Sequence, residues 1–191
     1  NLAVAVENLR PGPNSVPSGE MACAMTFQGV VAGVFLAAQR REPMESPDEV
    51  TVVVGHGVAG DRYAGGAGTF STTPGTGRQV TLIEQEAVDA AGREYGVGIE
   101  GRETRRNILT SGVPLNHLVG RRFSVGDAVL VGMRLAEPCA HLESLTRPGV
   151  RGALIHRGGL RADVVRGGTI RVGDPIVPLP DDSDEGDRPG A

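Results

Sequence analysis

Short runs of apolar residues, separated by glycines, prolines and polar residues, recur along most of the chain. The runs are rich in Val, Ile and Leu and few of them have helical spacing, which is typical of short β-strands. The pattern therefore predicts strands at residues 29–38, 49–54, 79–83, 107–110, 122–125, 128–131, 162–165, 169–172 and 176–177.

A different spacing occurs between residues 84 and 95, where apolar residues recur at helical intervals and Gly96 follows as a stop. The residues on this face are Ala87, Val88, Ala91 and Tyr95. Shorter helices are expected around residues 115–119 and from Pro138 onward, because proline suits the first turn of a helix. Together these elements predict a mostly β (α+β) fold, with a β-barrel core and a few short helices at its margins.

The two ends of the chain differ in composition from its middle. Residues 1–24 are rich in Pro, Gly, Ser and Asn and lack apolar periodicity, and residues 179–191 are acidic. Segments of this kind bury too little apolar surface to fold. We therefore expect one domain over residues 25–178, between a disordered leader and an acidic disordered tail.

Composition and charge narrow the classes of function. A net charge of −4 and an isoelectric point near 5.6 argue against a nucleic-acid partner. The apolar run at residues 29–38 is too short to cross a membrane and lacks the basic region that precedes a secretory signal. Of the two cysteines, Cys23 falls in the expected leader, so a structural disulfide with Cys139 is not expected. These features predict a cytoplasmic protein that binds neither nucleic acid nor membrane.

Cys139, in the segment LAEPCAHL, is the first candidate for chemistry. A helix that begins at Pro138 would put Cys139 on its first turn, where the positive end of the helix stabilises a thiolate. A thiolate is a soft metal ligand and a sulfur nucleophile. The residue could instead be a buried, unreactive cysteine, which is a common role. Likewise His141 could modulate the thiolate or face solvent, and the spacing leaves both questions open.

A cluster of arginines is the second candidate. Arg102, Arg105 and Arg106 come just before Asn107, which opens the strand expected at residues 107–110. A planar guanidinium suits bidentate binding of phosphate. Because side chains alternate along a strand, we expect Arg105 and Arg106 to point in opposite directions, so that one of them faces a pocket. A solvated charged edge explains the cluster equally well.

Glycines mark a long loop and a turn. The loop at residues 55–70 could bring backbone amides close to an anion, and Asp61 and Arg62 add a polar pair to it. It lacks the spacing of a P-loop and the strand–helix context of a dinucleotide site. Farther along, Gly167 and Gly168 suit a hairpin turn between the two strands that flank them.

Taken in order, the segments GDRYAG, VTLIE, RRNILTSGVPLNHLVGRRFSVGDAVL, EPCAHL and RGGLRADVVRGGTIRVGDPI resemble the MOSC domain. That domain is named after the C-terminal part of molybdenum-cofactor sulfurases. The resemblance covers about residues 28–178, and the layout is similar to the small stand-alone bacterial type. It implies a β-barrel fold and the molybdenum cofactor (molybdopterin) as ligand. In related proteins the cysteine of the EPC element ligates molybdenum or is a proposed carrier of persulfide sulfur, and the resemblance implies these roles for Cys139.

The resemblance also implies roles for the polar segments. Arg106 and Asn107 match the RRN element of the family and would lie on the cofactor side or organise the pocket. Asp61 and Arg62 match its GDR element. On this reading Arg106, supported by Arg105 and Arg62, neutralises the pterin phosphate, while Asn107 supplies hydrogen bonds.

Two functions of different class remain. The first is a molybdenum-cofactor-binding or sulfur-handling protein, either a molybdenum-dependent oxidoreductase or a sulfur transferase. By analogy, an oxidoreductase would reduce N-hydroxylated compounds with electrons from a separate protein. Two cysteines cannot hold an iron–sulfur cluster, and the sequence shows no flavin or haem motif. A sulfur carrier would need a sulfur-donor protein. The alternative is a non-redox module that keeps the fold and binds another anionic small molecule or a protein partner.

Overall fold

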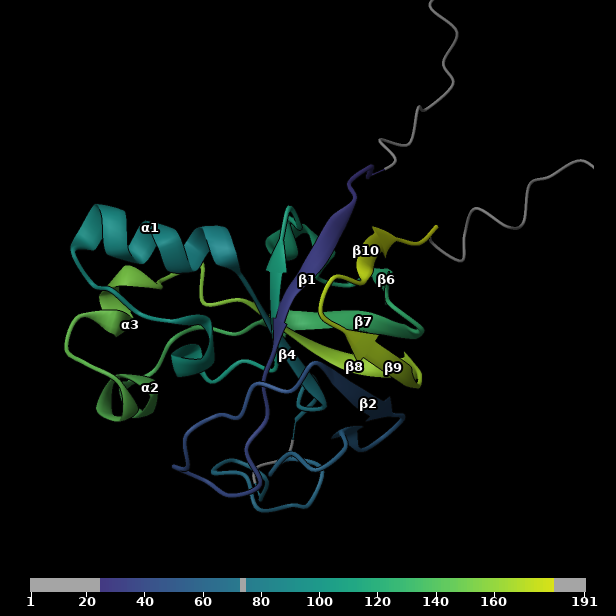
Figure 1. Ribbon diagram of the computed structural model, residues 1–191, viewed down its shortest axis with the longest axis horizontal. Helices are drawn as coiled ribbons and strands as arrows, with labels where there is room; N and C mark the ends of the chain where they lie inside the picture. The colour runs from purple at the N-terminus through teal and green to yellow at the C-terminus, as the bar shows by residue number, and fades with distance from the viewer. Residues whose placement is uncertain (1–24, 73–74, 181–191) are drawn as a thin grey trace, which may run out of the picture.

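The computed structural model describes residues 25–72 and 75–180, and a closed β-barrel forms its centre (Figure 1). Seven of the strands in these residues close the barrel in the order β1-β10-β6-β7-β8-β4-β5. Their bounds are β1 Gly29–Val34, β4 Val80–Glu84, β5 Ile108–Ser111, β6 Arg122–Val125, β7 Ala128–Leu135, β8 Leu160–Arg166 and β10 Pro175–Pro178. The mostly β fold class that the sequence predicts is confirmed.

A second, smaller sheet lies beside the barrel. Its order is β3-β2-β9, with β2 at Glu49–Val53, β3 at Gly57–Val58 and β9 at Gly168–Arg171. Strand β3 lies inside the segment expected to be a loop. It forms because Gly57 and Val58 return along β2, where Val58 pairs with Val52.

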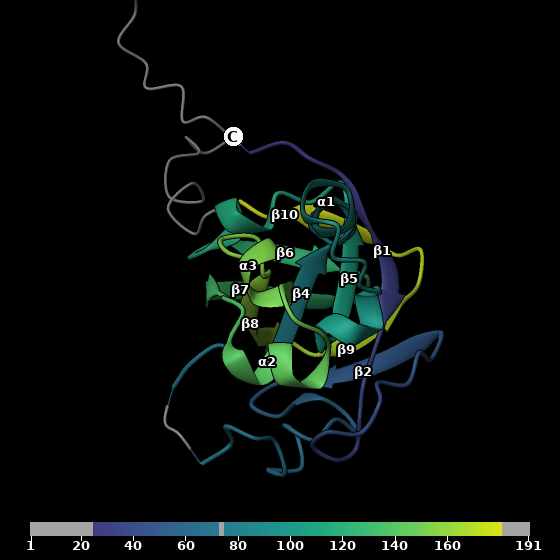
Figure 2. The same ribbon diagram turned by 90° about the vertical axis from the view of Figure 1, so that its left-hand side faces the viewer.

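The helices gather on one side of the barrel, in front of β4 and β5 in Figure 2. They are α1 at Gln85–Tyr95, α2 at Ala140–Leu145 and α3 at Val150–Ala153, with 3₁₀ turns η1 at Gly101–Thr104 and η2 at Leu115–Leu118. Helix α1 ends as expected at Gly96, whose φ of 66° and N–H bonds to the last turn cap it. No helix in the described ranges has the length and apolar character to cross a bilayer.

Strands β4 and β5 carry apolar side chains on both faces, toward the inside of the barrel and toward its outside. Leu82 and Ile108 belong to the core that fills the barrel. Their neighbours Ile83 and Leu109 belong to a second core, which lies under the helices and includes Leu142 of α2. Because successive side chains point to opposite faces of a strand, one sequence of consecutive apolar residues supplies both cores.

The prediction of a hairpin turn at Gly167 and Gly168 is wrong. Strand β8 pairs with β4 and β7 in the barrel, whereas β9 pairs with β2 in the second sheet. A Cβ atom on Gly168 would come within 2.7 Å of the Asp127 backbone, and one on Gly167 within 2.8 Å of the Val52 carbonyl oxygen. These glycines therefore let the chain cross closely from one sheet to the other, which the sequence pattern does not distinguish from a turn.

Several element boundaries differ from the expected ones, and two of these differences lie near the candidate site. Strand β1 ends at Val34 rather than at residue 38, because Leu36 leaves β5 and pairs with Glu45 instead. Helix α2 begins at Ala140 rather than at Pro138. The expected leader at residues 1–24, with Cys23, and residues 181–191 of the expected tail lie outside the described residues.

Candidate functional site

A pocket opens at one end of the barrel, where the glycine-rich loop, α2, β8 and the segment before β5 meet. Its lining is Arg62, Tyr63, Thr69, Phe70, Thr81, Arg105, Arg106, Glu137, Cys139, His141, Leu142, Leu145 and Arg161. The volume of the pocket that the centres of water molecules can reach is about 70 Å³, so the pocket has room for a few waters. A ligand larger than that must displace the loop or project from the mouth.

Cys139 stands exposed on the wall of this pocket, as a free thiol. It is the residue before the first turn of α2, in an extended conformation with φ −131° and ψ 167°. The expectation of a helix that starts at Pro138 and carries Cys139 on its first turn is therefore wrong by two positions. The alternative of a buried cysteine is excluded, because the residue is exposed.

Arg106 is buried directly behind the cysteine segment. Its Nε donates to the Gly158 carbonyl oxygen at 2.9 Å, and its Nη2 donates to the Ala136 carbonyl oxygen at 2.6 Å. The side chain thus clamps the end of β7 to the start of β8, just before the chain reaches Cys139. Burial and, to a smaller extent, the positive charge of Arg161 lower the pKa of Arg106 to about 10, while Cys139 acts in the opposite sense. The guanidinium remains charged at neutral pH.

Arg105 also lines the pocket, which corrects the prediction that only one of the two arginines does so. Alternation fails because Arg105 does not lie in a strand. It ends η1 with a left-handed backbone, φ 64°, and β5 begins only at Ile108. Burial, and then the charge of Arg62, lower the pKa of Arg105. The guanidinium groups of Arg105 and Arg62 therefore face the same pocket and repel one another.

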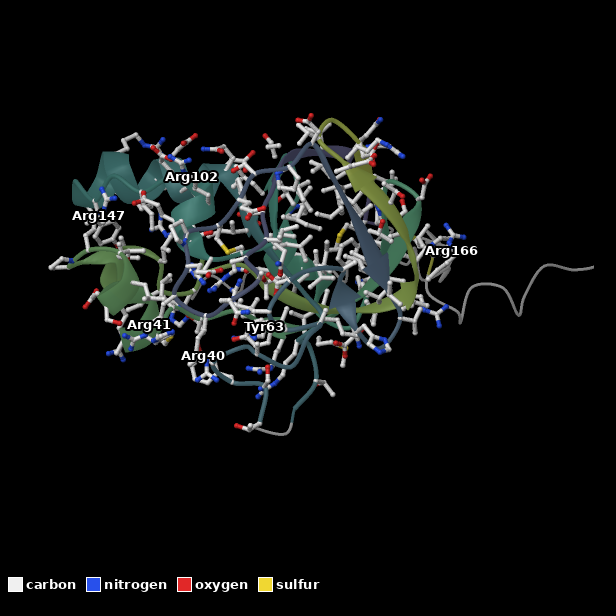
Figure 3. The ribbon with its side chains drawn as sticks, turned by 60° about the horizontal axis from the view of Figure 1, so that its bottom comes forward. Arg40, Arg41, Tyr63, Arg102, Arg147 and Arg166 are labelled. Atoms are coloured by element: carbon white, nitrogen blue, oxygen red, sulfur yellow. The ribbon has the colours of Figure 1, made fainter. Side chains whose placement is uncertain are left out.

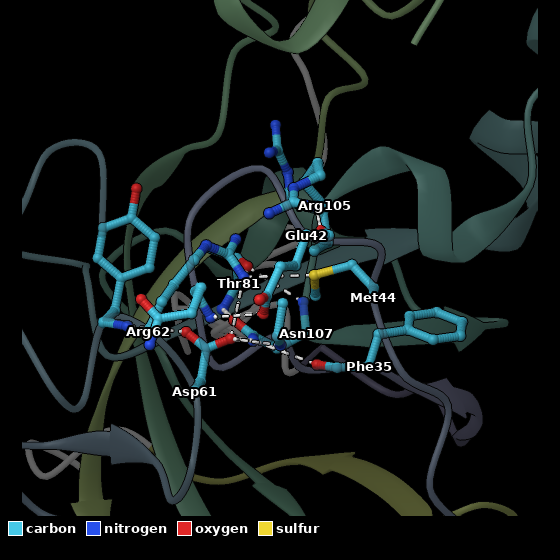
Figure 4. A network of polar contacts seen from close by, with 12 residues as sticks. Phe35, Glu42, Met44, Asp61, Arg62, Thr81, Arg105 and Asn107 are labelled. Atoms are coloured by element: carbon cyan, nitrogen blue, oxygen red, sulfur yellow. Dashed lines mark hydrogen bonds and ion pairs between the residues drawn. The ribbon is translucent and has the colours of Figure 1, made fainter. Parts of the chain in front are cut away.

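A buried polar network holds Arg62 in place (Figure 4). Asp61 Oδ2 accepts hydrogen bonds from Arg62 Nη1 at 3.0 Å and from the Ala37 amide at 3.2 Å, and its Oδ1 accepts one from the Tyr63 amide. Asn107 Nδ2 donates to Asp61 Oδ2 at 3.4 Å. Satisfied networks of this kind fix a single arrangement of the chain.

Asn107 and Asp61 thus lie behind the pocket wall and are not part of its lining. Besides contacting Asp61, Asn107 accepts hydrogen bonds at Oδ1 from the amide and hydroxyl of Thr81, and it donates to the Phe35 carbonyl oxygen. It therefore joins β4, β5 and the end of β1. Of the residues that the sequence singles out, the structure brings Cys139, Arg62, Arg105 and Arg106 into one pocket, with Asp61 and Asn107 supporting them.

The glycine-rich loop is attached to α2 through His141. Thr69 Oγ1 lies 3.4 Å from His141 Nε2, and the ring of Phe70 meets the imidazole edge-on, with 6.0 Å between centroids. The sequence does not decide whether His141 faces the thiol or the solvent. The contacts show that it faces the pocket and the loop rather than open solvent.

His141 provides a prediction about pH. Burial lowers its pKa from the ordinary value of 6.5, and nearby positive charges lower it further. Those charges belong to Arg41, Arg105 and Arg62. In an NMR titration of the ring protons, we expect a midpoint below 6.5, and a higher midpoint in Arg41→Gln because one repelling cation is removed.

The sign of the effect on stability follows from the same shift. The unfolded chain binds a proton at His141 at higher pH than the folded chain, so the contribution of this residue disfavours the fold as the pH falls below 6.5. A midpoint in Arg41→Gln that is equal to or lower than that of the unchanged protein would contradict the assignment. Arg40→Gln serves as the control for a general loss of charge.

Several residues of the pocket are not identifiable from the sequence. Arg161 in β8 lies opposite Thr81 of β4, and only the pairing of these distant strands brings them together. Glu137 lies in the predicted EPC element, but its partner His156 comes from a separate loop. The His156 amide and ring Nδ1 bond the two carboxylate oxygens at 3.0 and 3.1 Å, and the backbone bond is the main cause that lowers the pKa of Glu137.

The donor set of the pocket limits how it could hold a metal. Residues 25–72 and 75–180 contain no group of three or more His, Cys, Asp or Glu side chains arranged to bind a metal ion. A metal at Cys139 would therefore have to bring most of its ligands with it, as a metal held by an organic cofactor does. The surrounding arginines favour a ligand with negative charge.

Comparisons with known proteins agree with this architecture. Residues 61–177 match the family model described as MOSC domain. The solved structure of YuaD from Bacillus subtilis is similar with a TM-score of 0.69 at 20% identity, covering 82% of this chain and 99% of that one. YiiM from Geobacillus stearothermophilus gives 0.61 at 15%, covering 80% and 75%. YiiM from Escherichia coli gives 0.58 at 16%, covering 82% and 71%. No curated protein matches the sequence.

Proposed function

Because this chain belongs to the MOSC domain family, whose model matches residues 61–177, we propose that its Cys139 pocket binds the molybdenum cofactor. In this proposal the Cys139 thiolate is the protein ligand of the metal. The cofactor accounts for a site that offers one soft ligand and several cations but no cluster of metal-binding side chains. The likeness to YuaD and YiiM supports the fold alone.

One observation carries the proposal: an exposed thiol shares a pocket with three arginines that have no carboxylate partner among the described residues. These are Arg105, Arg106 and Arg161, whereas Arg62 is paired with Asp61. Burying a guanidinium without a counter-ion is unfavourable, and Arg106 is 8% exposed. A bound anion would supply the missing negative charge, and a thiolate at Cys139 would add to it.

The chemistry of the residues that line the Cys139 pocket fits the molybdenum cofactor. A thiolate is a soft ligand that suits a metal already coordinated by the sulfur atoms of a pterin. Planar guanidinium groups suit the phosphate that such a pterin carries. The space inside the pocket is small, so the cofactor either projects from the mouth or displaces the loop that contains Thr69 and Phe70 from His141. That attachment consists of one long hydrogen bond and one ring contact.

Each side chain then has a defined task. Cys139 ligates the metal, while Arg106 fixes the segment that carries Cys139 and contributes positive charge behind it. Arg105 and Arg62 neutralise the phosphate, and Asp61 keeps Arg62 in position. Bound molybdenum would supply oxygen-atom transfer, and we propose reduction of N-hydroxylated compounds as the reaction, with a separate protein as electron donor.

A second candidate function uses the same thiol. The exposure of Cys139 allows a sulfur-donor protein to reach it, which favours a role as carrier of persulfide sulfur. Arginines around the thiol would stabilise a persulfide anion as they would a thiolate. The two functions differ in whether metal and pterin stay with the purified protein.

The experiment is to purify the protein from cells that make the cofactor and to measure bound molybdenum, bound pterin and intact mass. We expect molybdenum and pterin in similar amounts in the unchanged protein. Cys139→Ser should retain less than about a tenth of the molybdenum, because the loss of a charged ligand costs well over a factor of ten in affinity. Cys23→Ser, which removes the other cysteine, should retain it.

The outcomes separate the alternatives. Absence of metal together with an additional sulfur atom on Cys139 would replace the cofactor proposal with the carrier role. Equal molybdenum in Cys139→Ser and the unchanged protein would show that the thiol is not the ligand. If neither metal nor added sulfur is found, the protein is a non-redox module that retains the fold.

A further inference from the structure

A second hollow, of about 250 Å³, lies next to the Cys139 pocket. It runs between the segment that follows β1 and the η1 turn, and we call it the Arg41 groove. Its lining is Arg41, Glu42, Pro43, Met44, Arg102, Glu103, Arg105 and Leu145. Arg105 and Leu145 line the Cys139 pocket as well, so the two hollows share a wall.

The charges of the Arg41 groove leave it with one net positive charge. Arg102 is paired with Glu100 at 2.8 Å, and Glu103 is paired with Arg147. Within residues 25–72 and 75–180, Arg41, Arg105 and Glu42 have no ion-pair partner. Two unpaired cations and one unpaired anion remain. The groove is therefore matched to a ligand that carries a single negative charge.

The other side chains of the groove are apolar. Pro43, Met44 and Leu145 present hydrocarbon and a thioether to the space between the charged residues. Met44 is buried, and its sulfur accepts a hydrogen bond from Arg62 Nη1 at 3.3 Å. An inorganic anion would leave the accessible surfaces of Pro43 and Leu145 in contact with water, whereas an organic anion would cover them.

Two residues in the walls of the groove have an unusual backbone conformation. Three non-glycine residues in the described part of the chain have positive φ, and two of them, Arg41 at 69° and Arg105 at 64°, line this groove. Left-handed backbone is uncommon for arginine and persists only where the surroundings impose it. Here Arg105 Nη1 donates to the Glu42 carbonyl oxygen, Glu42 Oε2 accepts from the Gln39 amide, and Glu45 pairs with Leu36.

From these observations we propose that the Arg41 groove is a binding site for a small organic carboxylate. Arg41 holds the carboxylate group, Arg105 adds positive charge from the wall shared with the Cys139 pocket, and the apolar body of the ligand packs against Pro43 and Leu145. A preformed site of this kind binds without first ordering its own walls. Figure 3 shows Arg41 at the surface beside Arg40, which is not part of the groove lining.

The shared wall gives the site a role. A carboxylate held at Arg41 lies beside the wall that the groove shares with the Cys139 pocket, which is formed by Arg105 and Leu145. The groove would thus orient an anionic substrate toward that pocket. Only this role rests on the proposed function, because the binding site itself requires neither metal nor pterin.

The test uses benzoate as the probe, with ¹⁵N NMR shifts and calorimetry on the full chain. Saturable binding at millimolar benzoate is expected, with the largest shifts at the amides of residues 41–44 and 102–105. Benzamide, which has the same shape without the charge, and acetate, which has the charge without the ring, should each bind about tenfold more weakly or worse. Arg41→Gln should weaken benzoate binding by about tenfold, and Arg40→Gln by less than about twofold.

Each contrary result overturns the proposal. Equal loss in Arg41→Gln and Arg40→Gln would mean general attraction to a positive surface. Acetate or benzamide binding as tightly as benzoate would refute the class of ligand, and absence of saturable binding would refute the site. Cys139→Ser should bind benzoate unchanged, so failure of the metal assay leaves this inference standing. Loss of benzoate binding in that variant would move the site to the thiol pocket.

Discussion

Arg106→Met is expected to lower the free energy of unfolding by about 3 kcal/mol, because buried carbonyl oxygens lose their donors. Arg106 bonds the carbonyl oxygens of Gly158 and Ala136, which lie at the ends of β8 and β7. Methionine has a similar length and fills the space, but it donates no hydrogen bond. The gain from no longer burying a charge offsets part of the loss. Chemical denaturation at neutral pH, monitored by circular dichroism, measures the difference.

Two control variants identify the cause of the loss. Arg106→Lys keeps the charge but reaches fewer acceptors, so we expect it to recover part of the stability and not all of it. Arg161→Gln removes a half-buried arginine of the same pocket that makes no described bond to a backbone carbonyl, and its effect should stay below about 1 kcal/mol. If Arg106→Met is as stable as the unchanged protein, then Arg106 does not clamp β7 to β8.

Gly159→Ala is expected to destabilise the fold by about 4 kcal/mol or more, because the added methyl group meets backbone rather than a movable side chain. A Cβ atom there would lie 1.9 Å from the Leu82 carbonyl oxygen, and the φ of Gly159 is +101°. The next residue, Leu160, pairs with Leu82 in the barrel. Alanine would therefore separate β4 from β8 at the edge of the Cys139 pocket.

Gly173→Ala provides the matched control for Gly159→Ala. Its φ of +91° is similar, but no atom lies within 4 Å of the added Cβ. Only the backbone strain is then added, which amounts to about 1–2 kcal/mol. Thermal and urea denaturation of the two variants separate strain from overlap. Equal losses in both would show that the close approach of β8 to β4 is not rigid.

The fold could be predicted to a large extent because periodicity records which faces of an element are buried. The helix at residues 85–95 and most of the barrel strands follow from apolar spacing and from stops such as Gly96. The spacing does not record which strands pair. The glycines at 167 and 168 illustrate this, since a hairpin turn and a close crossing between sheets both require small residues there.

The candidate site could be predicted in its motifs but not in its arrangement. Cys139, Arg62 and Arg106 stand out in the sequence as reactive or anion-binding residue types, and they line one pocket. Arg161 does not stand out, because it enters the pocket only through the pairing of β8 with β4. The prediction that only one of Arg105 and Arg106 faces a pocket fails, because Arg105 lies outside the strand, in a left-handed backbone set by the η1 turn and the Glu42 carbonyl oxygen.

The amino-acid sequence by itself determined that this chain is a strand-rich MOSC domain with a cysteine and an arginine cluster as its chemical groups. Local preferences and alternation suffice for the strands, because they depend on neighbours within a few residues, whereas the family follows from the resemblance of the motifs in their order along the chain. The tertiary structure decided that Cys139 is exposed and that Arg106 is buried behind it. It also decided that a second groove adjoins the pocket. Burial and electrostatic repulsion between arginines depend on contacts between segments far apart in the chain, and only the folded barrel brings those segments together.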